Sequence, residues 1–258
     1  MSAVDAVIIG VGGFLAGIIN AMAGGGSLLT VPLLAISGLG GTVANGTNRV
    51  AVLIQNATSA WGYARRGVGD RARTLPVLAP AAVGALIGSV VASQIDDRLF
   101  ERIFGVLMIP LLVLSVWPNR SSASDGGAEG DDEAEPQRWP WWVTYLAFFG
   151  VGIYGGAVQA GIGLILLLVL SRAGFDLVTA NGVKTLVILV ITLIAVPVFI
   201  LNGQVRWLPA AVLSLGTGIG GYVGANLAID GGERLIKPVL VVVVVVLASR
   251  MIGLWELF

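Results

Sequence analysis

Long apolar blocks separated by short polar stretches run through the whole chain. Blocks such as 186–201 and 239–248 are continuously apolar instead of alternating, which is the pattern of a transmembrane helix and not of a transmembrane β-strand. The blocks fall at 3–23, 27–39, 43–63, 75–95, 103–117, 141–160, 161–171, 177–201, 208–229 and 235–252. The pattern predicts an all-α membrane protein that crosses the cytoplasmic membrane several times.

Two of these blocks are too short to cross a bilayer. As helices, blocks 27–39 and 161–171 would reach only about 17–20 Å, whereas the hydrocarbon core is about 30 Å thick. Each follows a glycine-rich break, and three consecutive glycines stand at 24–26. Glycine adds backbone freedom and ends a helix readily. The pattern therefore predicts a broken or re-entrant helix pair at each of these places.

The two breaks belong to two similar halves of the chain. The motif Ala44-Asn45-Gly46 recurs as Ala180-Asn181-Gly182, and Gly24-x-Gly26 recurs as Gly161-x-Gly163, at offsets of 136 and 137 positions. This common order and nearly constant offset predict an internal duplication, as in many secondary transporters. Each repeat would hold one broken or re-entrant pair followed by three transmembrane helices. Three full crossings per repeat would invert the second repeat, although the distribution of basic residues does not decide between inverted and parallel repeats.

A polar stretch separates the repeats, which we place at 1–117 and 139–258. The stretch 118–138 holds six acidic residues and only two arginines. It offers too little apolar surface to fold alone, so we expect an acidic disordered linker. In the inverted arrangement the linker would lie in the cytoplasm and both termini outside.

The composition narrows the function classes. Only 12% of the residues are charged, against about 25% in a soluble domain, so a soluble protein is excluded. Cysteine and histidine are absent, which removes thiolate chemistry and the commonest metal ligand. The net charge is zero and no basic run occurs, so we expect no nucleic-acid partner, and neither an enzyme nor a bound cofactor.

Two basic residues lie inside apolar blocks and away from loops and final ends. Arg49 and Lys184 each stand near the start of the long block that follows a short one, while every acidic residue lies in a terminus, a loop or the linker. A buried cation without an acidic partner is a candidate site for a bound anion. The alternative is that both side chains snorkel to the membrane interface.

The other residues that we expect to bind substrate are glycines and neutral polar residues near the breaks. Helix N-termini after Gly26 and Gly163 would offer N–H donors to an anion. The alternatives are tight glycine packing and helix capping by the asparagines. The complete expected set is Asn20, Gly24, Gly25, Gly26, Ser27, Thr47, Asn48, Arg49, Gln159, Gly161, Gly163, Asn181, Lys184 and Thr185.

The stretch from Gly17 to Pro32, Gly-Ile-Ile-Asn-Ala-Met-Ala-Gly-Gly-Gly-Ser-Leu-Leu-Thr-Val-Pro, is followed by Ala44-Asn-Gly-Thr-Asn48. Together they resemble the TauE/SafE sulfite exporter family, also called the TSUP family. A fainter copy stands in the second half, and the resemblance covers nearly the whole chain except the linker. It implies a carrier for sulfite, thiosulfate or related sulfur and organic anions, often driven by the proton-motive force.

We therefore expect a secondary transporter that moves a small sulfur-containing anion across the lipid bilayer. In this hypothesis the anion binds between the repeats, held by broken-helix N-termini and the two cations. An anion channel, or a transporter of a non-sulfur organic anion, is the alternative. The identity of the anion, the direction of transport, the coupling ion and assembly with further copies of the chain stay open.

Overall fold

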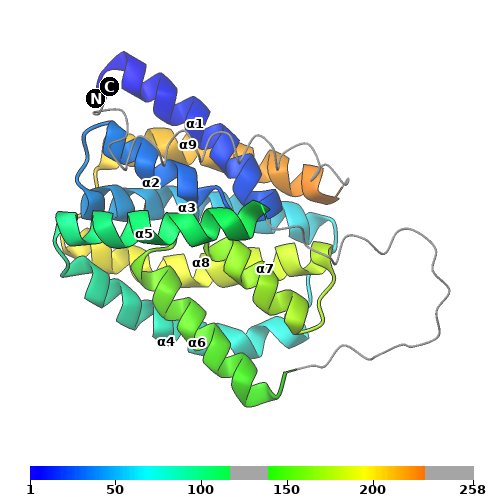
Figure 1. Ribbon diagram of the computed structural model, residues 1–258. Helices are drawn as coiled ribbons and strands as arrows, with labels where there is room; N and C mark the ends of the chain where they lie inside the picture. The colour runs from blue at the N-terminus through cyan, green and yellow to red at the C-terminus, as the bar shows by residue number, and fades with distance from the viewer. Residues whose placement is uncertain (117–138, 230–258) are drawn as a thin grey trace.

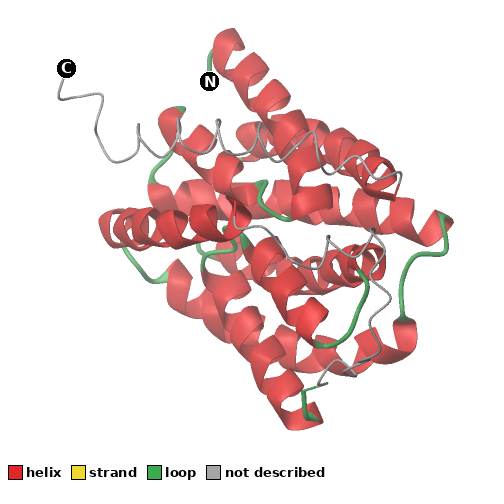
Figure 2. Cartoon of the chain, turned by 45° about the vertical axis from the view of Figure 1, so that its right-hand side comes forward, coloured by secondary structure: helices red, strands yellow, loops and turns green. Residues whose placement is uncertain are grey.

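The structure is a computed structural model that describes residues 1–116 and 139–229. Over these ranges the chain forms helices joined by short loops (Figures 1 and 2). The helices are α1 Ala3–Ala23, α2 Ser27–Ile36, α3 Gly41–Arg65, α4 Arg71–Ser93, α5 Asp97–Val116, α6 Trp141–Ala157, α7 Ile162–Arg172, α8 Leu177–Leu201 and α9 Trp207–Ile229.

The helices coincide with the predicted apolar blocks. Four of them, α1, α4, α8 and α9, are long and apolar enough to cross a membrane, while α2 and α7 are shorter apolar helices. Large apolar side chains also point outward, including Leu193 at 58% and Leu215 at 68% exposure. Such a surface suits lipid rather than water, and the prediction of an all-α membrane protein is confirmed. The predicted linker 118–138 and the last block, 235–252, lie outside the described residues.

Both short helices fold back on the helix before them. Gly26 lies against Ala16 and Asn20, and Leu33 packs on Gly12, so α2 runs antiparallel to α1. In the second half, Ile162 at the start of α7 lies against Gly155 near the end of α6. Figure 1 shows both pairs as hairpins. Each pair is therefore a helical hairpin and not one kinked rod.

Two parallel helix pairs enclose the centre of the molecule. In Figure 1, α1 and α9 lie at the top of the view, and α4 and α6 at the bottom. Glycines bring each pair into backbone contact: Gly216 and Gly220 of α9 meet carbonyl oxygens of α1, and Gly84 and Gly88 of α4 meet carbonyl oxygens of α6. Small residues four positions apart are a common way for membrane helices to approach closely.

The two longest helices, α3 and α8, lie between these pairs and run antiparallel. Gly46, near the start of α3, lies against Gln204 just after α8, while Gly182, near the start of α8, lies against Val68 just after α3. The first, polar turns of each of these helices therefore lie beside the last turns of the other. In the sequence, one short helix, α2 or α7, separates each break from the long helix that follows it.

The tight contact between α4 and α6 predicts that one added methyl group at a contact glycine destabilises the fold. The Cβ of a Gly156→Ala variant would lie 2.2 Å from the carbonyl oxygen of Ala85, and a helix backbone cannot move aside cheaply. We expect the overpacking to cost about 1–3 kcal/mol and to lower the melting temperature of the detergent-solubilised protein. Gly150→Ala is the matched control on the same helix, because its Cβ would have no atom within 4 Å. Equal melting temperatures for the two variants would contradict this packing.

Candidate functional site

The two helix breaks touch each other in the centre of the protein. A Cβ on Gly24 would lie 2.4 Å from the carbonyl carbon of Gly163, and a Cβ on Gly163 would lie 2.4 Å from the Cα of Gly24. Only glycine fits on either side of this crossing. Gly24 and Gly161 have φ angles of 78° and 62°, in the left-handed region that glycine enters at no steric cost. The predicted glycines therefore make the breaks and also let them meet.

Gln159 adopts the same left-handed conformation without being glycine. Its φ angle is 63°, which costs about 1–2 kcal/mol for a residue with a side chain. Strain of this kind is concentrated at functional sites, where the surrounding structure holds it. The side-chain amide of Gln159 donates to Thr192 Oγ1 at 2.8 Å, and its Oε1 has no partner among the described residues.

Ser27 joins the first break to the second. Its hydroxyl donates to the carbonyl oxygen of Gln159 at 3.2 Å and accepts from the N–H of Gly161 at 3.0 Å. The first residue of α2 is thus fixed to the turn that precedes α7. The two helix N-termini face the same region, and each carries a partial positive charge.

The helix starts differ slightly from the expectation. Helix α2 begins at Ser27 with Gly26 as its N-cap, as predicted. Helix α7 begins at Ile162 with Gly161 as its N-cap, so Gly163 lies inside the helix and its role is close contact with Gly24. The prediction that the second N-terminus follows Gly163 is wrong by two residues, because Gly161 already supplies the left-handed turn.

Arg49 is fully buried and caps the end of α6. Its Nη1 donates to the carbonyl oxygen of Gly155 at 2.9 Å and its Nη2 to that of Ala157 at 2.8 Å. The guanidinium also lies 4.5 Å from the centre of the Phe199 ring. Asn45, one turn earlier on α3, donates to the same Ala157 oxygen at 3.0 Å. Arg49 Nε has no partner among the described residues.

Lys184 makes the corresponding contact with the end of α1. Its side chain is 1% exposed. The Nζ donates to the carbonyl oxygens of Asn20 and Ala21, both at 3.2 Å, and to Asn181 Oδ1 at 2.6 Å. Each cation thus reaches from the long helix of one half to the broken helix of the other half.

The burial of Arg49 and Lys184 excludes one of the two interpretations of these cations. Snorkelling to the membrane interface is wrong for both, because Arg49 is 0% and Lys184 1% exposed. Their main-chain partners are carbonyl oxygens in the last turns of α6 and α1, where a helix carries a partial negative charge. The described acidic residues lie instead at or near helix starts: Asp5, Asp70, Asp96, Asp97, Glu101 and Asp176.

Sequence reasoning gave no site role to two polar residues that the structure places beside the breaks. Gln55 Oε1 accepts from the amide of Asn20 at 2.9 Å, and Thr192 holds Gln159. Each ties a polar residue at or just before a break to the long helix that follows it. A polar residue inside an apolar block was the available signal, but interhelical hydrogen bonding explains such residues equally well.

Within the part of the chain that the structure describes, three of the expected site residues make no hydrogen bond to the residues at the breaks. Asn48 is fully buried, and neither atom of its amide has a partner among the described residues. The hydroxyl of Thr47 accepts from the N–H of Arg206 in the loop before α9, and Thr185 bonds within its own helix to Asn181. Thr47 and Thr185 therefore have structural partners, whereas the amide nitrogen and oxygen of Asn48 have none among the described residues.

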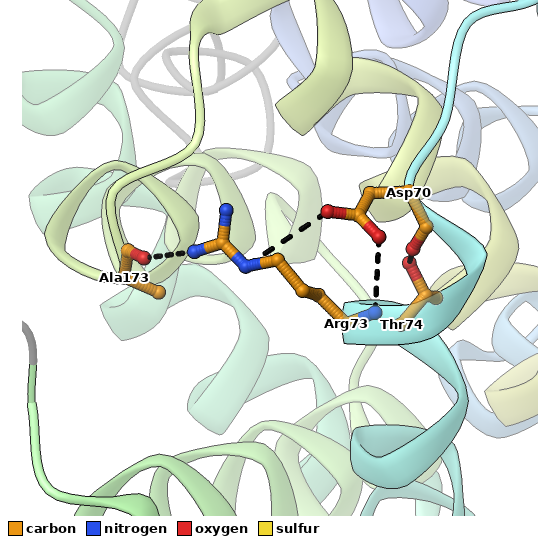
Figure 3. Close-up of polar contacts among 4 residues, drawn as sticks. All are labelled: Asp70, Arg73, Thr74 and Ala173. Carbon is orange, nitrogen blue, oxygen red and sulfur yellow. Dashed lines mark hydrogen bonds and ion pairs between the residues drawn. The ribbon is translucent and has the colours of Figure 1, made fainter.

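A cavity of about 270 Å³ lies elsewhere, where α4 and α6 begin and α7 ends. Its lining includes Arg73, Trp139, Tyr145 and Phe175 and contains no residue of the expected site. The guanidinium of Arg73 is already engaged, because its Cζ lies 3.9 Å from the centre of the Phe175 ring. It also donates to the carbonyl oxygen of Ala173 (Figure 3). The buried polar groups at the breaks are therefore the stronger candidate for the functional site.

A helical membrane fold with polar groups buried at two helix breaks is the architecture of a multi-pass membrane transporter. The sequence profile of the family described as "Sulfite exporter TauE/SafE" matches residues 9–251. The chain belongs to this TauE/SafE family.

Relatives agree with that assignment over most of their length. A "Probable membrane transporter protein ORF9" of Sinorhizobium sp is 29% identical over 94% of this chain and 90% of its own. A "Probable membrane transporter protein" of Haemophilus influenzae is 27% identical, over 93% and 91%. "Probable membrane transporter protein YfcA" of Escherichia coli K12 is 25% identical, over 92% and 86%. No solved structure matches the chain significantly. The protein is thus a membrane transporter and not an enzyme.

Ser27→Ala tests whether the bridge between the breaks matters. The change removes two hydrogen bonds and leaves the buried N–H of Gly161 without its acceptor, which costs about 1–3 kcal/mol. We expect a lower melting temperature and slower transport. Ser37→Ala is the control at the other end of α2, because within the described part of the chain the Ser37 hydroxyl donates to Leu33 of α2 and does not reach the second break. If Ser27→Ala behaves like Ser37→Ala, the bridge does not hold the breaks together.

Proposed function

We propose that the protein is a secondary transporter of a small sulfur-containing anion, of the sulfite, thiosulfate or organosulfonate type. The anion would bind where the two breaks meet, between two inverted repeats. The description of the family supports the substrate class, and the buried polar groups at the breaks support the location. The observation that carries the proposal is that Arg49 Nε and the Asn48 amide are fully buried and have no partner among the described residues.

Reciprocal packing supports the inverted duplication. The first helix of each half, α1 or α6, packs parallel to the fourth helix of the other half, α9 or α4. The equivalent long helices α3 and α8 run antiparallel to each other. Both relations follow from two copies of one unit related by a two-fold axis in the membrane plane, which is the inverted arrangement of many secondary transporters.

The charge balance at the centre favours an anion. Arg49 and Lys184 each contribute a full positive charge, while the C-terminus that each one caps contributes only about half a negative charge. The N-termini of α2 and α7 add a partial positive charge each. A net positive potential therefore remains in a region from which water is largely excluded, where charge interactions are strong.

The spare hydrogen-bonding groups fit a small oxyanion. Arg49 Nε and the Asn48 amide nitrogen are donors on adjacent residues of α3, and an anion needs donors. The Asn48 and Gln159 side-chain oxygens, which are also without partners in the described residues, could accept from a hydroxyl of a protonated oxyanion. A ligand of this class would satisfy polar groups that are otherwise costly to bury.

The enclosed site favours a carrier over an open channel. Every polar or charged side chain in the expected set is at most 5% exposed. A bound anion could leave only after helices move, as alternating access requires.

Arg49 variants test the proposal directly. Arg49→Ala removes the charge and the spare donor, whereas Arg49→Lys keeps the charge and loses Nε. Loss of a charged hydrogen bond is worth about 1.5–3 kcal/mol, so we expect anion affinity to fall about 10- to 100-fold in Arg49→Lys and further in Arg49→Ala. Uptake into proteoliposomes and melting temperature should be measured with sulfite, thiosulfate, sulfate, sulfonates and carboxylates, because a ligand that binds the folded state stabilises it.

Arg98→Ala is the matched control, since Arg98 is an exposed arginine at the start of α5. It should retain transport and the ligand-induced stabilisation. If both Arg49 variants are folded and transport as well as the control, the proposed anion site is wrong.

A further inference from the structure

The ammonium group of Lys184 occupies a cage of oxygen atoms. Two are main-chain carbonyl oxygens of the last turn of α1, from Asn20 and Ala21, and the third is the side-chain oxygen of Asn181. Three oxygens around one positive centre at a broken-helix C-terminus resemble a monovalent cation site. In transporters with discontinuous helices, such ends commonly coordinate a free sodium ion.

The cage has a physical reason to hold a positive charge. Each of the two carbonyl oxygens already accepts one hydrogen bond, Asn20 O from the N–H of Gly24 at 3.0 Å and Ala21 O from the hydroxyl of Tyr63 at 3.1 Å. A carbonyl oxygen has a second lone pair, and at this buried helix end Lys184 supplies a second donor to each. The helix end also carries about half a negative charge, so a cation satisfies both the hydrogen bonds and the charge.

Lys184 fills this place completely. An ammonium group has three N–H donors, and the three oxygens accept one each. Asn181 lies one turn before Lys184 on α8 and holds the group at 2.6 Å. No donor is left over for a substrate in this conformation, unlike in Arg49, whose Nε is spare. The two buried cations therefore have different tasks.

We propose that the ammonium group of Lys184 is a tethered monovalent cation that closes the C-terminal end of α1. It takes the place that a free alkali ion occupies in other discontinuous-helix transporters. Two consequences follow. The folded protein needs no free alkali cation at this site, and removal of the side chain leaves an oxygen-lined vacancy that accepts a small free cation such as Na⁺ or NH₄⁺. The inference concerns how Lys184 is held, and its test needs no transported anion.

The experiment compares Lys184→Ala with Lys184→Met. Alanine empties the cage, whereas methionine fills the space with an uncharged chain of similar length. Melting temperatures of the detergent-solubilised proteins are measured in choline chloride and then in NaCl, KCl or NH₄Cl at the same chloride concentration. We expect Na⁺ or NH₄⁺ to raise the melting temperature of Lys184→Ala saturably, by about 2–5 °C, and to leave Lys184→Met and the wild type unchanged.

Arg172→Ala is the matched control, because Arg172 is an exposed basic residue in the last turn of another short helix, α7. Its melting temperature should not respond to the cation. A Lys184→Ala variant that is unaffected by all three cations overturns the proposal. So does a wild-type protein that Na⁺ stabilises relative to choline by as much as the variant, a measurement that stands even if Lys184→Ala fails to fold. No transported anion is added, so the result is independent of the Arg49 test.

Discussion

A helix that ends in the buried interior of a protein presents carbonyl oxygens with a partial negative charge, and a buried lysine or arginine needs such acceptors for its positive charge. In this protein the two buried cations bond to the ends of two buried helices. Arg49 reaches the end of α6, and Lys184 reaches the end of α1. Since each contact joins one half of the chain to the other, the burial of the cations and the position of the broken helices are fixed together.

Close approach of helix backbones lets each cation reach the helix end of the other half. The breaks can meet only because Gly24 and Gly163 have no side chains, and α1 and α6 reach the centre because glycines let them pack tightly on α9 and α4. Lipid offers no hydrophobic drive for helices to associate, so tight packing and interhelical hydrogen bonds must hold them. The high glycine content of the chain therefore serves both the interfaces and the breaks.

Much of this architecture could be predicted from the sequence. Apolar blocks give the helix bounds closely because lipid allows few alternatives to a helix, and three consecutive glycines mark the first break. The partners of Arg49 and Lys184 could not be predicted, because main-chain carbonyls carry no signature in the sequence. The Gly24–Gly163 contact and the position of Gln55 also depend on how distant helices pack. The absence of buried acidic partners suggested an anion for both cations, whereas the geometry leaves a spare donor on Arg49 and uses the three donors of Lys184.

The proposed anion site lies beside Arg49 and Asn48, where the two breaks meet. The most direct measurement is an experimental structure of the protein with the anion that stabilises it most, or with its heavier selenium congener to mark the position. The account predicts density within hydrogen-bonding distance of Arg49 Nε and the Asn48 amide, with Lys184 still bound to the end of α1. Density confined to the peripheral cavity beside Arg73, with the centre unchanged and empty, would contradict it.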